Sequence, residues 1–227
     1  MNYNYEKGKI HVMTEYKYPS FEKSSIEITH AISTLKRHGI NIQLPNHLVK
    51  KFDATTLFDG HDGLFKELIK LAEIYFEYGC GKSTEFVFKY SSSSIYAVDT
   101  SNDWVHKIKS LEGIESSNRV NLFWVDVGVV ENWGTPTSFK MRHNFKKYAE
   151  LFWLNNKTPD LVLIDGRFRV SCFLTSVKFA PVGTKILFDD YKNRPFYHVV
   201  EEFCQKLDTC GRQALFEVSA KAKEQIS

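Results

Sequence analysis

Acidic side chains follow short apolar runs at four places along this chain. Asp99, Asp126 and Asp165 end three of these runs, and the pair Asp189 and Asp190 ends a fourth. One such acid means little, because solvated turns favour aspartate. The repetition is informative, because the carboxyl ends of neighbouring strands in an open α/β sheet meet at the edge where ligands bind. The spacing therefore predicts a carboxylate-rich site at one edge of a sheet.

Three of these acids, Asp165, Asp189 and Asp190, form a set of hard oxygen donors. They follow the apolar residues 161–164 and 186–188. Such oxygens are the ligands that Mg²⁺ and Mn²⁺ prefer. A cation bound there would lower the pKa of an acceptor hydroxyl and would orient that hydroxyl. The alternative is that the three carboxylates bind backbone groups or cap helices.

The stretch 77–84, Glu-Tyr-Gly-Cys-Gly-Lys-Ser-Thr, is the most informative motif. Glycine lets the backbone turn sharply and approach a ligand closely. Gly81, Lys82 and Ser83 complete half of a triphosphate-binding loop. However, the glycine that this motif needs five residues before Gly81 is Phe76. The sequence therefore disfavours a nucleotide triphosphatase and predicts a shorter cofactor loop.

This stretch resembles the first motif of the class I S-adenosylmethionine-dependent methyltransferases, which Glu77, Gly79 and Gly81 match. Asp99 lies eighteen residues after Gly81, where this family has an acid that accepts from both ribose hydroxyls. Asp126 resembles the family residue that contacts the adenine amine. The resemblance covers residues 60–205 and implies S-adenosylmethionine as cofactor. It assigns these residues to cofactor binding: Glu77, Gly79, Gly81, Ser83, Asp99, Thr100, Asp126, Val127 and Asp165.

The acids that follow residues 161–164 and 186–188 are also similar to those of the divalent-metal-dependent O-methyltransferases that act on catechols, caffeoyl thioesters and certain sugars. That resemblance implies Mg²⁺ or Mn²⁺ bound by Asp165, Asp189 and Asp190. The catechol-type enzymes place a lysine three residues after the first metal acid, whereas this chain has Phe168. The general base therefore stays open between metal activation alone, Asp190 and His198.

Arginines stand close to these acids at Arg167, Arg169 and Arg194. The guanidinium fork binds carboxylates and phosphates at two points, so the cluster indicates an anionic acceptor such as a uronic acid, a sugar phosphate or a nucleotide-linked sugar. Salt bridges to the aspartates are the alternative. Residues 160–200 are also similar, more loosely, to methyltransferases of polysaccharide assembly. We expect methylation of a hydroxyl on a small polar acceptor, a sugar or a glycan, by the catalytic set Asp165, Asp190, Arg167 and His198.

The elements that must position these residues alternate between apolar strand-like runs and helical patterns. Strands are predicted at 74–78, 95–98, 122–125, 161–164, 186–188 and 214–218, and helices between them. Nearly continuous apolar strands are typical of a parallel sheet that is buried on both faces. The prediction is a doubly wound, mostly parallel Rossmann-like methyltransferase sheet. It has seven strands, or six if only one follows the fifth, and Val199, Val200, Phe203 and Leu207 predict a helix before that last strand.

The domain organisation divides at residue 60. Residues 61–227 are predicted to form the S-adenosylmethionine-binding catalytic domain. Residues 1–60 fit the alternation poorly and are predicted to be a cap, with one helix around residues 28–35. The 227 residues suit one well-buried core, which is consistent with a single catalytic domain.

Composition excludes several other classes. The chain has 30 basic and 27 acidic residues mixed along its length, so no nucleic-acid partner is expected. No apolar run approaches the length of a membrane span, and four cysteines without a CxxC pair indicate a reduced, cytoplasmic protein. Two alternatives stay open. One is an NAD(P)-linked oxidoreductase, which is disfavoured because this chain lacks the third glycine of the GxGxxG motif, and the other is a non-catalytic cofactor-binding partner subunit. No pattern indicates the oligomeric state.

Overall fold

The computed structural model describes residues 3–6, 9–12 and 56–226. Within the predicted N-terminal cap it describes the antiparallel strands β1 (Tyr3–Glu6) and β2 (Lys9–Val12). The helix expected around residues 28–35 lies outside the described residues, so the cap stays a prediction. None of the described helices is long and apolar enough to cross a membrane.

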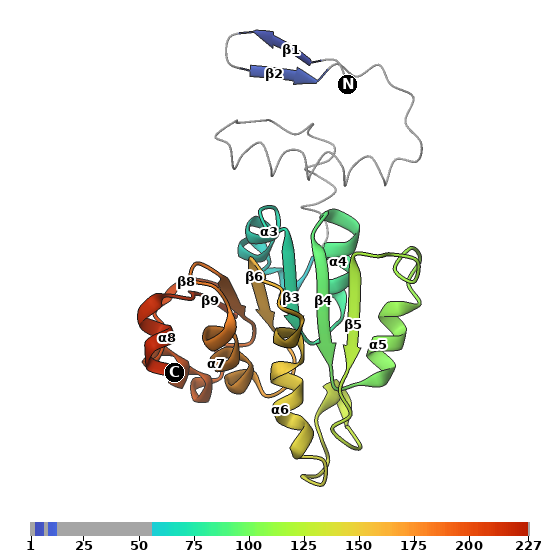
Figure 1. Ribbon diagram of the computed structural model, residues 1–227, viewed down its shortest axis with the longest axis vertical. Helices are drawn as coiled ribbons and strands as arrows, with labels where there is room; N and C mark the ends of the chain where they lie inside the picture. Colours follow the sequence, from blue (N-terminus) through green and yellow to red (C-terminus); the bar gives the residue numbers. More distant parts are fainter. Residues whose placement is uncertain (1–2, 7–8, 13–55, 227) are drawn as a thin grey trace.

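A seven-stranded sheet forms the centre of the molecule, which settles the strand count predicted from the sequence (Figure 1). Its order is β5-β4-β3-β6-β7-β9-β8, with strands β3 to β7 parallel and β9 antiparallel to both β7 and β8. The bounds of the strands are β3 Ile74–Tyr78, β4 Ser94–Asp99, β5 Val120–Trp124, β6 Leu161–Ile164, β7 Lys185–Phe188, β8 Lys206–Cys210 and β9 Gln213–Glu217.

The strand order reverses beside β3, and this point positions the site. β3 pairs with β4 on one side and with β6 on the other, so that Glu77 lies opposite both Ala97 and Leu163. β5 lies beside β4 on one side of β3, and β7 lies beside β6 on the other side. Loops that leave the carboxyl ends of β3 and β6 therefore diverge and leave room for a ligand.

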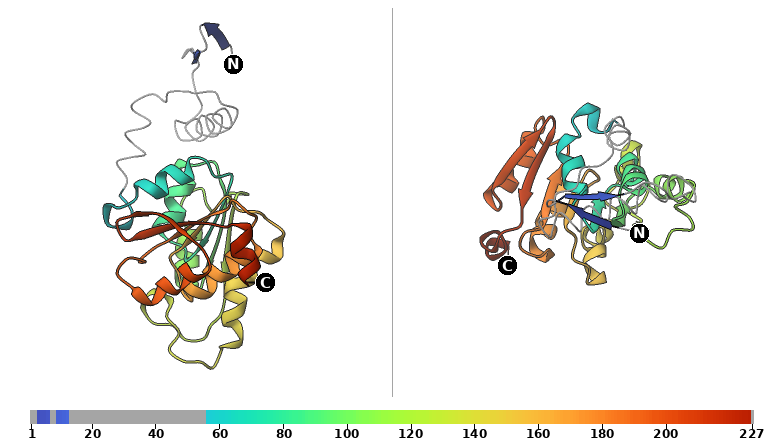
Figure 2. Two further views of the ribbon diagram at one scale, coloured as in Figure 1. Left: turned by 90° about the vertical axis from the view of Figure 1, so that its left-hand side faces the viewer. Right: turned by 90° about the horizontal axis from the view of Figure 1, so that it is seen from above.

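Helices cover both faces of the sheet, as a doubly wound fold requires. Figure 2 shows this arrangement from above. One face carries α3 (Gly63–Ile69), α4 (Lys82–Tyr90) and α5 (Asn102–Lys109), whose buried residues pack on β3 and β4. The other face carries α6 (His143–Glu150), α7 (Arg169–Phe179) and α8 (Ala220–Ile226), which share a core with Phe76, Ile164 and Phe216.

Local sequence signals explain several element boundaries. Ser101 caps α5 by accepting a hydrogen bond from the backbone N–H of Trp104 at 3.3 Å. Leu57 is 5% exposed and joins the core, so the packed unit includes residues before position 61. β5 begins at Val120 and ends at Trp124, two residues earlier at its start than predicted.

The helix predicted from Val199, Val200, Phe203 and Leu207 is wrong in its second half. A 3₁₀ helix covers Pro195–Glu202, and Leu207 lies in β8. β8 is the outermost strand at one edge of the sheet, and Leu207 is 51% exposed there. A partly solvated edge strand needs no continuous apolar run, so its sequence carries little strand signal.

Candidate functional site

The glycine loop after β3 is built by close contact with the loop after β6. Gly79 has a φ of +96°, and a Cβ added there would lie 2.8 Å from the Gly166 Cα and 2.9 Å from its nitrogen. A Cβ added to Gly166 would overlap the hydroxyl of Tyr148. In contrast, a Cβ on Gly81 would meet nothing within 4 Å. Gly79 and Gly166 therefore serve packing, whereas Gly81 faces open space where a ligand can approach the backbone.

Glu77 is fully buried beneath this loop. Its carboxylate accepts from Ser83 Oγ at 2.5 Å, from Thr84 Oγ1 at 2.5 Å and from the Tyr75 hydroxyl at 2.9 Å. The backbone N–H of Gly81 in turn donates to Thr84 Oγ1 at 2.8 Å. Burial raises the pKa of Glu77 to about 7, although the three hydroxyls favour its charged form. Glu77 and Ser83 thus hold the shape of the loop from below.

Asp99 lies at the carboxyl end of β4, next to the glycine loop. Its Oδ2 accepts from the backbone N–H of Cys80 at 2.9 Å and its Oδ1 from that of Ser101 at 2.7 Å. Burial raises the pKa of this carboxyl. Each oxygen keeps a second lone pair, so two ribose hydroxyls could still donate to it. Thr100, also assigned to the cofactor, donates through Oγ1 to the Gly134 carbonyl at 2.7 Å.

Asp126 and Val127 follow β5 and differ in exposure. The Asp126 carboxylate is exposed and accepts from the backbone N–H of Gly128 at 2.9 Å. Val127 is 1% exposed and packs in the core that includes Tyr148. The side chain of Asp126 is therefore available to a ligand, whereas that of Val127 can only support the loop.

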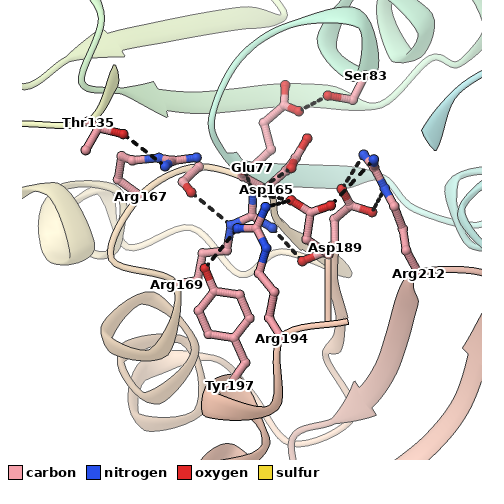
Figure 3. A network of polar contacts seen from close by, with 12 residues as sticks. Glu77, Ser83, Thr135, Asp165, Arg167, Arg169, Asp189, Arg194, Tyr197 and Arg212 are labelled. Carbon is pink, nitrogen blue, oxygen red and sulfur yellow. Dashed lines mark hydrogen bonds and ion pairs between the residues drawn. The ribbon is translucent and has the colours of Figure 1, made fainter. Parts of the chain in front are cut away.

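The three predicted metal acids come together at the carboxyl ends of β6 and β7. Figure 3 shows two of them, Asp165 and Asp189, next to each other. Carboxylate oxygens of Asp165, Asp189 and Asp190 all lie within 4.8 Å of one another. Asp165 is the most accessible, with its side chain 33% exposed, against 0% for Asp189 and 21% for Asp190. Burial and the neighbouring Asp189 carboxylate raise the pKa of Asp165. Asp190 has a φ of +55°, a strained conformation for aspartate.

Arginines hold the same oxygens. Arg212 forms a fork with Asp189, at 3.0 Å to Oδ1 and 2.7 Å to Oδ2, and its Nη1 also lies 2.7 Å from Asp59. Arg169 pairs with Asp165 at 3.1 Å and with Asp190 at 3.2 Å. The two Arg169 contacts are salt bridges of the kind that the sequence left as an alternative, whereas the Arg212 pair was not predicted.

Arg169 also fixes the backbone of both loops. Its guanidinium donates to the carbonyl oxygens of Asp165, Gly166 and Asp189, and its side chain is only 3% exposed. Arg194 pairs with Asp190 at 3.0 Å and is 39% exposed. Arg169 is therefore a structural residue that a ligand cannot reach, whereas the side chain of Arg194 is accessible to a ligand.

The acid cluster fits a divalent cation by donor type and spacing, since three hard oxygens converge. The guanidinium groups occupy those oxygens, so a cation would have to displace at least Arg212 from Asp189. Asp59 offers Arg212 a second carboxylate at 2.7 Å. The displacement therefore need not leave that arginine unpaired.

Arg167 and His198, predicted as catalytic, point elsewhere. Figure 3 shows Arg167 directed away from the acids toward Thr135, whose Oγ1 accepts from its Nη1 at 3.2 Å. His198 stacks on Tyr191 with ring centroids 4.7 Å apart, and its Nε2 lies 3.2 Å from the Tyr191 carbonyl oxygen. Among the described residues, His198 makes no hydrogen bond or ion pair with the three carboxylates.

Sequence reasoning missed Arg212, Gly134 and Thr135. Arg212 lies 22 positions after Asp190 and reaches the acids because β9 returns antiparallel beside β7. Gly134 and Thr135 lie in the irregular segment after β5 and contact the two predicted halves of the site through Thr100 and Arg167. Recognition of the β8–β9 hairpin would have placed Arg212 near the acids, but no sequence signal indicated the other two.

Comparison with known proteins identifies the fold. No protein-family model and no curated protein sequence matches the chain. A methyltransferase-like protein from Silicibacter pomeroyi is 26% identical with a TM-score of 0.61, over 82% of this chain and 94% of that one. The N-methyltransferase NodS from Bradyrhizobium japonicum WM9, in complex with S-adenosyl-L-homocysteine, is 13% identical with a TM-score of 0.43, over 82% and 97%. A TM-score of 0.43 is too low to support an inference.

The sheet order, the antiparallel β9 and the Silicibacter similarity together define the class of fold. This chain has the Rossmann-like fold of the methyltransferases. The prediction of a doubly wound α/β methyltransferase sheet is confirmed.

Proposed function

We propose that this protein is an S-adenosylmethionine-dependent O-methyltransferase that acts on a hydroxyl of a small polar acceptor, a sugar or a glycan. The observation that carries the proposal is the open backbone at Gly81 beside Asp99, at the same sheet edge as Asp165. Fold alone does not imply activity, so the proposal rests on these residues.

The cofactor half of the site would be formed by the loop after β3 and the end of β4. When bound, S-adenosylmethionine supplies a methyl group on a positively charged sulfur. Asp99 would accept from the ribose hydroxyls, and the Gly81 backbone would approach the cofactor without a side chain between them. Asp126 would lie on the adenine side, since its carboxylate is exposed after β5.

The acceptor half would be formed by the loops after β6 and β7. Asp165 is the most exposed of the three acids, so it is the carboxylate that an acceptor hydroxyl can reach. It would accept the hydroxyl proton as the acceptor oxygen forms its bond to the methyl carbon and the bond between that carbon and the sulfur breaks, which would leave S-adenosylhomocysteine as the second product. Arg169 holds Asp165 in place, and positioning of this kind supplies a large part of such a transfer.

Divalent-metal assistance is a further part of the proposal. Asp165, Asp189 and Asp190 would hold Mg²⁺ or Mn²⁺, which would polarise the acceptor hydroxyl. Because arginines hold these oxygens, we expect the cation to bind with micromolar affinity at best. We also expect its affinity to rise when Arg212 is removed, since Arg212 pairs with Asp189. Failure of Mn²⁺ to bind would remove the metal and leave Asp165 alone as the base.

Calorimetric titration with S-adenosylhomocysteine tests the cofactor site. We expect binding to the wild type and its loss in Asp99→Ala. Asp103→Ala is the matched control, because this exposed acid lies only four residues further along on α5. Absence of binding in the wild type would refute the proposed function. Repeating the titration with Mn²⁺ and then with chelator tests the metal separately.

The two other classes are less well supported. An NAD(P)-linked oxidoreductase of the dinucleotide-binding type would have a third glycine at Thr84, which instead donates to Glu77. Sheets of that type are mostly parallel, whereas β9 runs antiparallel to both of its neighbours here. A non-catalytic partner subunit would bind S-adenosylhomocysteine without any turnover that depends on Asp165.

A further inference from the structure

A group of residues beside the site has no role in holding the cofactor or a metal. This group is residues 128–147, which follow β5 and include the first half of α6, and we call it the arm. Figure 1 shows this connection extending beyond the carboxyl ends of β3, β4 and β5. We propose that the arm is the docking surface for an anionic oligosaccharide acceptor. This inference rests on the proposed function and names the surface that would deliver its substrate.

The arm exposes large apolar side chains. Val129, Trp133 and Phe139 are 75%, 76% and 74% exposed, and together with Leu154 they are the most exposed large apolar residues in the part of the chain that the structure describes. Exposed apolar groups that cluster in one segment indicate an interaction surface. Sugar rings have apolar C–H faces, and flat aromatic side chains bury such faces well.

The arm is also cationic. It has one acid, Glu131, and its last eight residues contain none. Those eight residues carry four exposed cationic side chains, Lys140, Arg142, Lys146 and Lys147. Of these, Lys146 lies 3.7 Å from Glu150. The remaining charge complements an acceptor that carries carboxylates or sulfates. Aromatic faces together with this charge favour an anionic sugar chain over a neutral one.

Direct contacts connect the arm to both halves of the site. The Gly134 carbonyl accepts from Thr100, the neighbour of Asp99, at 2.7 Å. Thr135 accepts from Arg167, two residues after Asp165, at 3.2 Å. A molecule bound to the arm would therefore lie within reach of both the cofactor side and the acid cluster.

A series of aromatic rings runs from the exposed part of the arm to the loop after β6. Phe139 and Phe145 have ring centroids 6.2 Å apart, and Phe145 and Phe168 4.4 Å apart. Phe168 directly follows Arg167, whose buried Nε has no hydrogen-bond partner among the described residues. Since a buried donor without an acceptor is costly, an anionic group of the acceptor would find a ready donor there.

Binding of the full-length chain to defined oligosaccharides tests the inference. The probes are decagalacturonate and a heparin decasaccharide, with maltodecaose as the neutral comparison. We expect an anionic probe to bind and its affinity to fall with added salt. The double variant Trp133→Ala/Phe139→Ala should lose roughly tenfold in affinity. Lys140→Gln/Lys147→Gln should lose roughly fivefold at low salt.

Matched controls lie away from the arm. Lys109→Gln/Lys178→Gln removes two exposed lysines near the ends of α5 and α7, and Val182→Ala truncates a side chain that is 60% exposed before β7. These variants should bind as the wild type does. Equal losses in controls and arm variants, no binding of either anionic probe, or binding only to phosphatidylglycerol vesicles would each overturn the inference.

S-adenosylhomocysteine titration of the same samples separates the two proposals. Cofactor binding without oligosaccharide binding would refute the docking surface alone. Oligosaccharide binding without cofactor binding would refute the proposed function, and with it the role of the arm as an acceptor site. Retained cofactor binding in the arm variants would also show that they are folded.

Discussion

Glu77 should make the folded protein less stable as the pH rises from 5 to 8. Burial raises its pKa to about 7 in the folded state, against 4.5 as the ordinary value. The folded state therefore holds this proton more tightly than the unfolded state does. The stabilisation is fully present below pH 4.5 and is lost as the pH rises through 7. Linkage gives a loss of about 2.5 kcal/mol in unfolding free energy between pH 5 and pH 8.

Urea unfolding of the wild type and of Glu77→Gln at pH 5, 6, 7 and 8 measures this loss. Glutamine keeps the shape of the protonated acid, and the hydroxyls of Ser83, Thr84 and Tyr75 can rotate to serve it. The difference between the two unfolding free energies isolates Glu77, because all other groups titrate in both proteins. Glu115→Gln, at an exposed position, should keep the wild-type profile. Parallel profiles for wild type and Glu77→Gln would refute the assignment.

Three further substitutions test other parts of the structure. Gly79→Ala should destabilise by about 3 kcal/mol in urea unfolding, because its φ is positive and Gly166 blocks the Cβ, whereas Gly63→Ala, with nothing within 4 Å, should not destabilise. Arg169→Met should cost about 3–5 kcal/mol, because Asp165 loses its arginine and the carbonyl oxygens of Asp165, Gly166 and Asp189 lose their donor, and Arg194→Met, 39% exposed, less than about 1 kcal/mol; equal costs would contradict this ranking. Arg212→Ala should strengthen Mn²⁺ binding roughly tenfold in calorimetry, because Asp189 gives up its fork; unchanged or weaker binding would argue against a metal at these acids.

Much of the fold could be predicted from the sequence because its central strands are buried on both faces. Residues 161–164 are a continuous apolar run and residues 74–78 are interrupted only by Glu77, and both became strands with the predicted bounds. The convergence of Asp165, Asp189 and Asp190 followed from strand direction alone. Edge strand β8 was missed because partial exposure removes that apolar signal.

The fine structure of the site could not be predicted, since it depends on side-chain direction. Arg167 and Arg169 are two residues apart, yet one reaches Thr135 and the other is buried between Asp165 and Asp190. Sequence spacing treats them alike. The pairing of Arg212 with Asp189 depends on a hairpin that brings distant residues together, and no local pattern records such a contact.

The backbone contact between Gly79 and Gly166 has a consequence for altering what this protein accepts. Because the two loops touch without side chains between them, a substitution that shifts the loop after β6 will also displace the loop after β3. Attempts to broaden the acceptor range at that loop should therefore damage the cofactor loop as well. The segment after β5 is joined to the site through side chains, by the hydrogen bonds of Thr100 and Arg167 and by the ring contact between Phe145 and Phe168, so it is the better place for directed diversification.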